Sequence, residues 1–86
     1  MIYYTYQEVL LHNNENSCWI LVDRNIYDVT EFLDIHPGSK KAILKYACQN
    51  VKQSYKYHSK GGRDLWKNYL IGKLLKKEIG YILNVF

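Results

Sequence analysis

The sequence predicts a small domain of mixed α and β structure, and three observations support this. A capping pattern at residues 5–8 predicts a helix start close to the N-terminus. Two runs rich in branched and aromatic residues, 18–22 and 26–29, predict a β-hairpin. From Ser39 onward, apolar residues recur at helical spacing. With 86 residues, 48% of them hydrophobic, we expect one domain, 1–86, with a core small enough to gain much from a bound cofactor.

Turn and cap residues divide the first half of the chain. The first helix is predicted to run to about His12, an exposed position at its end. Asp23-Arg24-Asn25 reverses the hairpin, and Asn25 is expected to take left-handed backbone geometry. Thr30 is expected to cap a further helical turn. That turn must end before Pro37, because a residue preceding proline is pushed out of helical geometry.

Three apolar stripes at helical spacing follow Ser39, which is itself a good N-cap. The third predicted helix is expected to end near Gly72. The stripes expected to be buried are Ala42, Ile43, Tyr46 and Ala47, then Val51, Tyr55 and His58, then Leu65, Trp66, Tyr69 and Leu70.

Two histidines carry the strongest chemical signal. His36 is followed by Pro37 and Gly38, which fix the chain and allow close approach, and His58 ends an apolar stripe 22 residues later. Two imidazoles facing each other across a gap can ligate one iron. A haem held in this way has no free axial position for dioxygen, so one-electron transfer is its main chemistry. The residues near both histidines that could enclose a flat macrocycle are Phe32, Ile35, Ala42, Ile43, Val51, Tyr55, Leu65 and Tyr69.

The two cysteines leave one alternative open. Cys18 and Cys48 form no C-x-x-C or C-x-x-C-H pattern, which argues against a redox dithiol and against covalent haem attachment. Both are expected to be small buried hydrophobic residues. A zinc site built from Cys18, His36, Cys48 and His58 is conceivable, although no pair has the close spacing that structural zinc sites usually show.

Charge is divided unevenly along the chain. Residues 1–38 hold one arginine and six carboxylates, whereas residues 39–86 hold eleven lysines or arginines and two carboxylates. The basic half attracts anionic partners, so a nucleic-acid-binding domain is a competing hypothesis, but the chain has no recognisable motif for reading RNA or DNA. The N-terminal segment lacks the basic start and following apolar run that are typical of a signal peptide, and no apolar run is long enough to span a bilayer. We therefore expect a soluble, cytoplasmic protein without a transmembrane anchor.

Taken as a whole, the pattern resembles the cytochrome b5 family of haem-binding domains over nearly the full length of the chain. The segments that carry the resemblance are Tyr4-Thr5, Glu8-Val9, His12-Asn13, Trp19-Ile20-Leu21-Val22, Ile26-Tyr27-Asp28-Val29-Thr30-Glu31-Phe32-Leu33, His36-Pro37-Gly38, His58-Ser59 and Tyr69-Leu70-Ile71-Gly72-Lys73-Leu74. The resemblance implies an α+β fold, with a small mixed sheet and two helical pairs that form a haem cleft.

The resemblance also implies the site. His36 and His58 would be the axial ligands of a noncovalent haem b, and Ser59 would lie near a propionate. Either Tyr55 or Tyr57 would supply aromatic packing on the haem. By matched position, the other pocket residues would be Val22, Val29, Phe32, Ala42, Ile43, Leu65, Trp66 and Tyr69.

The function that the resemblance implies is that of a monomeric one-electron carrier, not an enzyme, working between a reductase and an acceptor protein. A haem-binding regulatory module is the alternative within the same fold. The chain departs from the family where Ser39 replaces a second glycine and where the segment between the ligands is shorter. It also places Lys40, Lys41 and Lys45 where the family commonly has acids, so we expect redox partners with acidic docking patches.

Overall fold

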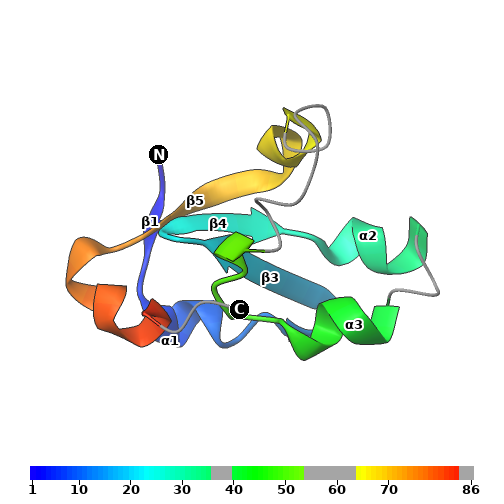
Figure 1. Ribbon diagram of the computed structural model, residues 1–86, viewed down its shortest axis with the longest axis horizontal. Helices are drawn as coiled ribbons and strands as arrows, with labels where there is room; N and C mark the ends of the chain where they lie inside the picture. The colour runs from blue at the N-terminus through cyan, green and yellow to red at the C-terminus, as the bar shows by residue number, and fades with distance from the viewer. Residues whose placement is uncertain (36–39, 54–63, 84–86) are drawn as a thin grey trace.

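The computed structural model describes residues 1–35, 40–53 and 64–83, with the backbone alone at Ile35. Its centre is a five-stranded sheet with the order β1-β5-β4-β3-β2 (Figure 1). Strand β1 is parallel to β5, and the other neighbouring pairs are antiparallel, so the sheet is mixed, as expected for the α+β fold. The strands are β1 (Tyr3–Tyr4), β2 (Asn13–Asn14), β3 (Ser17–Val22), β4 (Asn25–Asp28) and β5 (Leu70–Leu74).

Strands β3 and β4 form the predicted hairpin, in which Val22 pairs with Asn25. The left-handed residue of its turn is Asp23, at φ 52°, so the expectation for Asn25 was wrong. The Asp23 amide donates a hydrogen bond of 3.0 Å to the Oδ1 atom of the buried Asn50. The conformation of the turn is therefore fixed by a segment far along the chain, which a local pattern cannot reveal.

Short helices join and flank the strands. The first, α1, begins with the predicted capping box, in which the Glu8 amide donates to Thr5 Oγ1 at 3.2 Å and the Thr5 amide donates to Glu8 Oε1 at 3.3 Å. Figure 1 shows α2 and α3 together at one end of the molecule, where they contact each other. The helices are α1 (Tyr6–Val9), α2 (Thr30–Ile35), α3 (Lys40–Lys45) and the 3-10 helices η2 (Lys67–Tyr69) and η3 (Lys76–Ile82). Among the described residues, no helix combines the length and hydrophobicity needed to span a bilayer.

Helix α2 begins at Thr30, but the Thr30 hydroxyl is not its cap. This hydroxyl donates to Asp28 Oδ1 at 2.6 Å and accepts a hydrogen bond of 2.9 Å from the Cys18 amide. The Thr30 amide also donates to Asp28 Oδ1, at 3.1 Å. The Asp28 carboxylate, rather than the predicted Thr30 side chain, therefore accepts the backbone N–H at the start of this helix.

The third predicted helix ends earlier than its periodicity indicates. Residues 64–66 are helical and η2 continues them, but Leu70–Leu74 is strand β5, which lies between β1 and β4. The expected helix end near Gly72 was wrong because pairing on both sides outweighs the helical spacing. Gly72 is buried in this strand, where a Cβ atom would collide with the carbonyl oxygen of Ile2 and the ring of Tyr4.

Alternation along β3 sends successive side chains to two hydrophobic clusters, one on each face of the sheet. The first-face cluster contains Val9, Trp19, Leu21, Ile26, Cys48, Leu74 and Ile82. The second-face cluster contains Cys18, Ile20, Val22, Tyr27, Val29, Leu33 and Val51. Helix α1 supplies Val9 and η3 supplies Ile82 to the first cluster, and α2 supplies Leu33 to the second.

Helix α3 packs on the second face with a different set of residues from the predicted stripe. Ile43 and Tyr46 contact the second-face cluster as expected, and so does Leu44. Ala42 is exposed, so its predicted burial was wrong. Ala47 packs against both clusters, because the chain passes the edge of the sheet there.

Candidate functional site

The second-face cluster has a rim of apolar side chains that are only partly buried. They come from α2, from α3 and the residues after it, and from residues 64–70. The members of this second-face rim are Phe32, Ile43, Leu44, Tyr46, Ala47, Trp66, Tyr69 and Leu70. Because several large apolar side chains stay half-exposed, this face can bury more apolar surface by binding a flat hydrophobic group.

Aromatic contacts hold the segment 64–70 against this face. Phe32 of α2 and Tyr69 have ring centroids 4.6 Å apart with planes tilted by 54°. Tyr27 of β4 and Trp66 meet edge to face, with centroids 5.4 Å apart and an interplanar angle of 74°. Edge-to-face and tilted pairs are favourable geometries for aromatic rings, so the rim is a packed structure.

The structure brings together most of the described residues that the family resemblance assigns to the pocket. Val22 and Val29 are buried in the cluster itself. Phe32, Ile43, Trp66 and Tyr69 belong to the rim. Ala42 and Leu65 are exposed, Leu65 by 56%, and neither packs in the cluster. The remaining assigned residues, His36, Tyr55, Tyr57, His58 and Ser59, lie outside the described residues.

Four rim residues were not among the assigned pocket residues: Leu44, Tyr46, Ala47 and Leu70. The helical stripes of the sequence do contain Tyr46, Ala47 and Leu70, so periodicity was the signal that could have found them. Leu44 does not belong to the predicted helical stripe of this segment, and no other feature of the sequence indicates that it is buried.

Both histidine segments are flanked by residues of this same face. Leu33, three positions before His36, is in the second-face cluster, and Ile43 after it is in the rim. Val51, seven positions before His58, is in the cluster, and Trp66 after it is in the rim. Since an extended chain covers about 3.3–3.6 Å per residue, both histidines are within chain reach of one site on this face.

The charges close to α3 are partly neutralised. Lys40 Nζ lies 2.8 Å from Glu15 Oε2, and both side chains face solvent. The hydrogen bond from Lys40 lowers the pKa of Glu15, and the same bond raises the pKa of Lys40. Lys41 and Lys45 are exposed, and Lys45 Nζ lies 5.8 Å from the ring centroid of Tyr46. The positive charge that α3 offers to a partner is therefore mainly that of Lys41 and Lys45.

The cysteines are buried, as expected, and they belong to different clusters. Burial raises the pKa of Cys18 to about 11, and it also raises the pKa of Cys48 to about 11. Cys48 Sγ donates to the carbonyl oxygen of Val9 at 3.0 Å. Cys48 packs on the first face and Cys18 on the second. This arrangement fits two small core residues and does not favour the zinc alternative, which needs both as thiolates at one ion.

His12 differs from its expected exposed position. Its ring stacks on Trp19, with centroids 3.6 Å apart and an interplanar angle of 7°. Its Nδ1 atom lies 2.6 Å from Ser17 Oγ, within hydrogen-bond distance. Because Trp19 belongs to the first-face cluster, this histidine is occupied in packing and is not part of the second-face site.

A family model described as "Cytochrome b5-like Heme/Steroid binding domain" matches residues 5–75. The chain belongs to the cytochrome b5 family. It is 38% identical over 77 residues to cytochrome b5 of Drosophila melanogaster, covering 87% of this chain and 58% of that protein. It is also 36% identical over 78 residues to Delta(5) fatty acid desaturase A of Dictyostelium discoideum, covering 87% of this chain but 17% of the relative.

Among solved structures, cytochrome b558 of Ectothiorhodospira vacuolata, described as a prokaryotic homologue of cytochrome b5, matches with a TM-score of 0.72. The two chains share 28% identity over 86% of this chain and 99% of the other. This chain spans 54–58% of the length of several cytochromes b5 to which it is similar.

The cytochrome b5 family binds b-type haem without a covalent bond. The described residues fit this cofactor, because the second face combines a buried apolar floor with a half-exposed aromatic rim. A macrocycle of this kind needs an apolar, water-poor enclosure of this composition.

Proposed function

We propose that the protein is a one-electron carrier that binds one b-type haem at the second face, with His36 and His58 as the two axial ligands. The observation that carries the proposal is the position of the residues flanking each histidine. Leu33 and Ile43 on one side, and Val51 and Trp66 on the other, all belong to the second-face cluster or its rim. Family membership supports the same cofactor.

With an imidazole at each axial position, the bound haem supplies a one-electron iron couple and no free site for dioxygen. The role of the protein is to bind the group, to orient it and to exclude water. In this proposal Val22 and Val29 form the floor, and Phe32, Ile43 and Tyr69 screen the iron from solvent together with Trp66. A low-dielectric enclosure of this kind favours the reduced, less charged iron centre.

The remaining assigned residues complete the proposed site. Ala42 and Leu65 are exposed in the structure, which leaves their side chains free to contact the edge of the cofactor. Tyr55 would pack on the macrocycle, and the Ser59 hydroxyl would donate to a propionate. These assignments follow from matched positions in the family, and each is open to test by substitution.

We further propose that redox partners dock with an acidic patch on Lys41 and Lys45. Both lysines are exposed on α3, which follows the first histidine segment, whereas Lys40 is already paired with Glu15. Two cations close to the site also raise its reduction potential relative to an acidic relative, because they stabilise the electron-rich state. A reductase and an acceptor with such patches are the expected partners.

The ligand assignment is tested by the absorption spectrum of the purified protein in its oxidised and dithionite-reduced forms. We expect a six-coordinate, low-spin spectrum that carbon monoxide does not change. His36→Ala and His58→Ala should each abolish it. His12→Ala is the matched control, because this histidine stacks on Trp19, and it should keep the spectrum. A five-coordinate spectrum in the unsubstituted protein would instead support a regulatory module, and persistence of the spectrum in either ligand variant would refute the assignment.

The docking surface is tested by the rate at which hexacyanoferrate(III), an anionic oxidant, oxidises the reduced protein. We expect the rate to fall as salt is added, and to fall several-fold in Lys41→Glu/Lys45→Glu at low salt. Lys76→Glu/Lys77→Glu is the matched control, since both lysines are exposed on η3, which Figure 1 shows in orange and red at the other end of the molecule. Equal effects of the two charge reversals would show that only net charge matters.

A further inference from the structure

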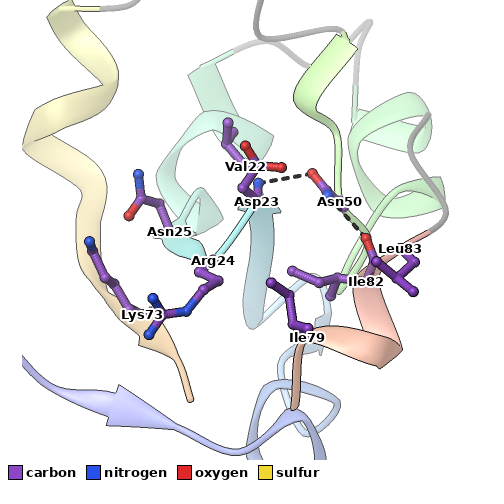
Figure 2. A pocket seen from close by; sticks show the side chains of 9 residues that line it. All are labelled: Val22, Asp23, Arg24, Asn25, Asn50, Lys73, Ile79, Ile82 and Leu83. Atoms are coloured by element: carbon purple, nitrogen blue, oxygen red, sulfur yellow. Dashed lines mark hydrogen bonds between the residues drawn. The ribbon is translucent and has the colours of Figure 1, made fainter. Parts of the chain in front are cut away.

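An open pocket of about 540 Å³ lies at the turn of the β3–β4 hairpin, where η3 passes it. Figure 2 shows Arg24 and Lys73 on one side of this pocket and Ile79 and Ile82 on the other. Of the second-face cluster only Val22 reaches it, and no residue of the second-face rim lines it. The pocket is therefore separate from the proposed haem site, and nothing in the proposed electron transfer uses it.

The cationic wall is fixed in place by strand β5. The Leu74 amide donates to the carbonyl oxygen of Arg24 at 2.7 Å, and Arg24 Nε donates in return to the carbonyl oxygen of Leu74 at 2.9 Å. Lys73 precedes Leu74 on that strand, and it pairs in register with Asn25. These reciprocal bonds hold Arg24 against strand β5, and among the described residues they use only the Nε atom of its guanidinium, not the two terminal nitrogens.

Neither cation of the wall has an acidic partner among the residues that the structure describes. The described ion pairs involve Lys40, Lys52 and Lys67, but not Arg24 or Lys73. Asp23 also lines the pocket, but its carboxylate lies 3.4 Å from Lys52 Nζ, so its charge is already compensated. Arg24 and Lys73 are both half-buried, which weakens the competition from water for their N–H groups.

The opposite wall is apolar, and its base is buried. Ile82 is buried, whereas Ile79 and Leu83 are exposed by 47% and 71% at the rim. Between the walls, Asn50 Nδ2 donates to the carbonyl oxygen of Ile82 at 3.1 Å, and Asn50 Oδ1 accepts from the Asp23 amide at 3.0 Å. The same buried side chain therefore ties the hairpin turn to η3 and sets the distance between the two walls.

We propose that this pocket binds a single-chain amphiphile with a carboxylate head, such as a medium-chain fatty acid. The head would be bound by the Arg24 guanidinium and the Lys73 ammonium, and the chain would lie on Ile79 and Ile82. A guanidinium next to an ammonium matches a carboxylate in charge and in hydrogen-bond geometry. The volume falls within the range of about 300–1,000 Å³ that is usual for small-molecule sites.

The test is an NMR titration of the ¹⁵N-labelled, haem-loaded protein with decanoate below its micelle concentration. We expect saturable shifts of the backbone amides of Arg24, Lys73 and Ile79. Decanol, which keeps the chain but lacks the charge, and acetate, which keeps the charge but lacks the chain, should both bind much more weakly. Shifts confined to residues of the second-face rim, or no saturation, would overturn the proposal.

Substitutions separate the charge requirement from folding. Arg24→Gln and Lys73→Gln should each weaken decanoate binding about tenfold, since charge-assisted hydrogen bonds are lost. Lys73→Gln is the safer variant, because Arg24 also bonds to Leu74 and its loss perturbs the strand. Lys76→Gln, an exposed lysine on η3 that does not line the pocket, is the matched control and should leave the affinity unchanged. Equal affinity in all three variants, or equal binding of decanol, would contradict the assignment of an anionic ligand.

Discussion

The first face of the sheet is covered by α1 and η3, whereas the second face is covered by α2, α3 and the segment 64–70. On the first face, Val9, Leu21, Ile26 and Leu74 are completely buried. On the second face, large side chains such as Phe32 and Tyr69 stay half-exposed around the buried cluster. The same strands thus support one core that the chain completes by itself and one that offers apolar surface to a cofactor.

The difference lies in what each covering element brings. Element η3 adds the buried Ile82 and α1 adds Val9 to the first face, and α2 likewise adds the buried Leu33 to the second, so the two faces differ at α3 and at residues 64–70. Of the helix α3 side chains, none is fully buried, and Ile43 and Leu44 only border the second cluster. A small domain can leave one of its two clusters incomplete in this way when a bound haem supplies the missing apolar contacts.

Two leucines on strand β5 give the largest expected contrast between the faces. Leu74 is completely buried in the first-face cluster, and Leu70 is half-buried in the second-face rim. In the haem-free protein, Leu74→Ala should lower the free energy of unfolding by about 2–5 kcal/mol. Leu70→Ala should lower it by only about 1 kcal/mol, because less apolar surface is lost. Urea denaturation measures both, and equal costs would mean that the two faces are equally complete.

Alanine substitutions at two glycines test how closely the elements on the first face pack. Gly72→Ala should lower the free energy of unfolding by about 1–3 kcal/mol, because the added methyl group meets the backbone of Ile2 and the ring of Tyr4. Gly80→Ala, in η3, has no atom within 4 Å of the added group and should change stability by less than about 0.5 kcal/mol. Thermal unfolding monitored by circular dichroism compares the two. A tolerated alanine at position 72 would show that β1 does not pack closely on β5.

The cysteines, one in each cluster, give an expected effect that depends on pH. Burial raises the pKa of each thiol to about 11, so the protonated form is favoured in the folded state. The resulting stabilisation is complete below the ordinary thiol pKa and is lost as the pH rises through the folded-state value. We therefore expect the urea midpoint to fall between about pH 8.5 and pH 11. This fall should be smaller in Cys18→Ala and Cys48→Ala. If the urea midpoint depends on pH equally in both variants and in the unsubstituted protein, the buried thiols are not its cause.

Local patterns predicted the elements whose causes are local. The Thr5 and Glu8 capping box lies within one helical turn, and the alternation along β3 follows from strand geometry. The failures have distant causes. Asp23 is left-handed in a turn whose amide is bound by Asn50, and Leu70 starts a strand because β4 pairs with it.

For the candidate site, the family resemblance and the helical periodicity each found residues that the other missed. Matched positions alone identified Val22 and Val29 in the cluster and Phe32 in the rim, whereas periodicity alone marked Tyr46, Ala47 and Leu70. Leu44 was missed, because neither its helical spacing nor the resemblance marks it. Likewise, the pairing of Lys40 with Glu15 joins residues 25 positions apart, and it was not predictable from charge alone.

The most direct test of the contrast between the faces is amide hydrogen exchange of the haem-free protein and of the same sample after haem is added. We predict that haem slows exchange strongly in α2, α3 and residues 64–70, and that α1 and the first-face residues of β3 and β5 exchange at nearly equal rates in both forms. Equal slowing on both faces, or slowing centred on α1 and η3, would contradict the assignment of the haem to the second face.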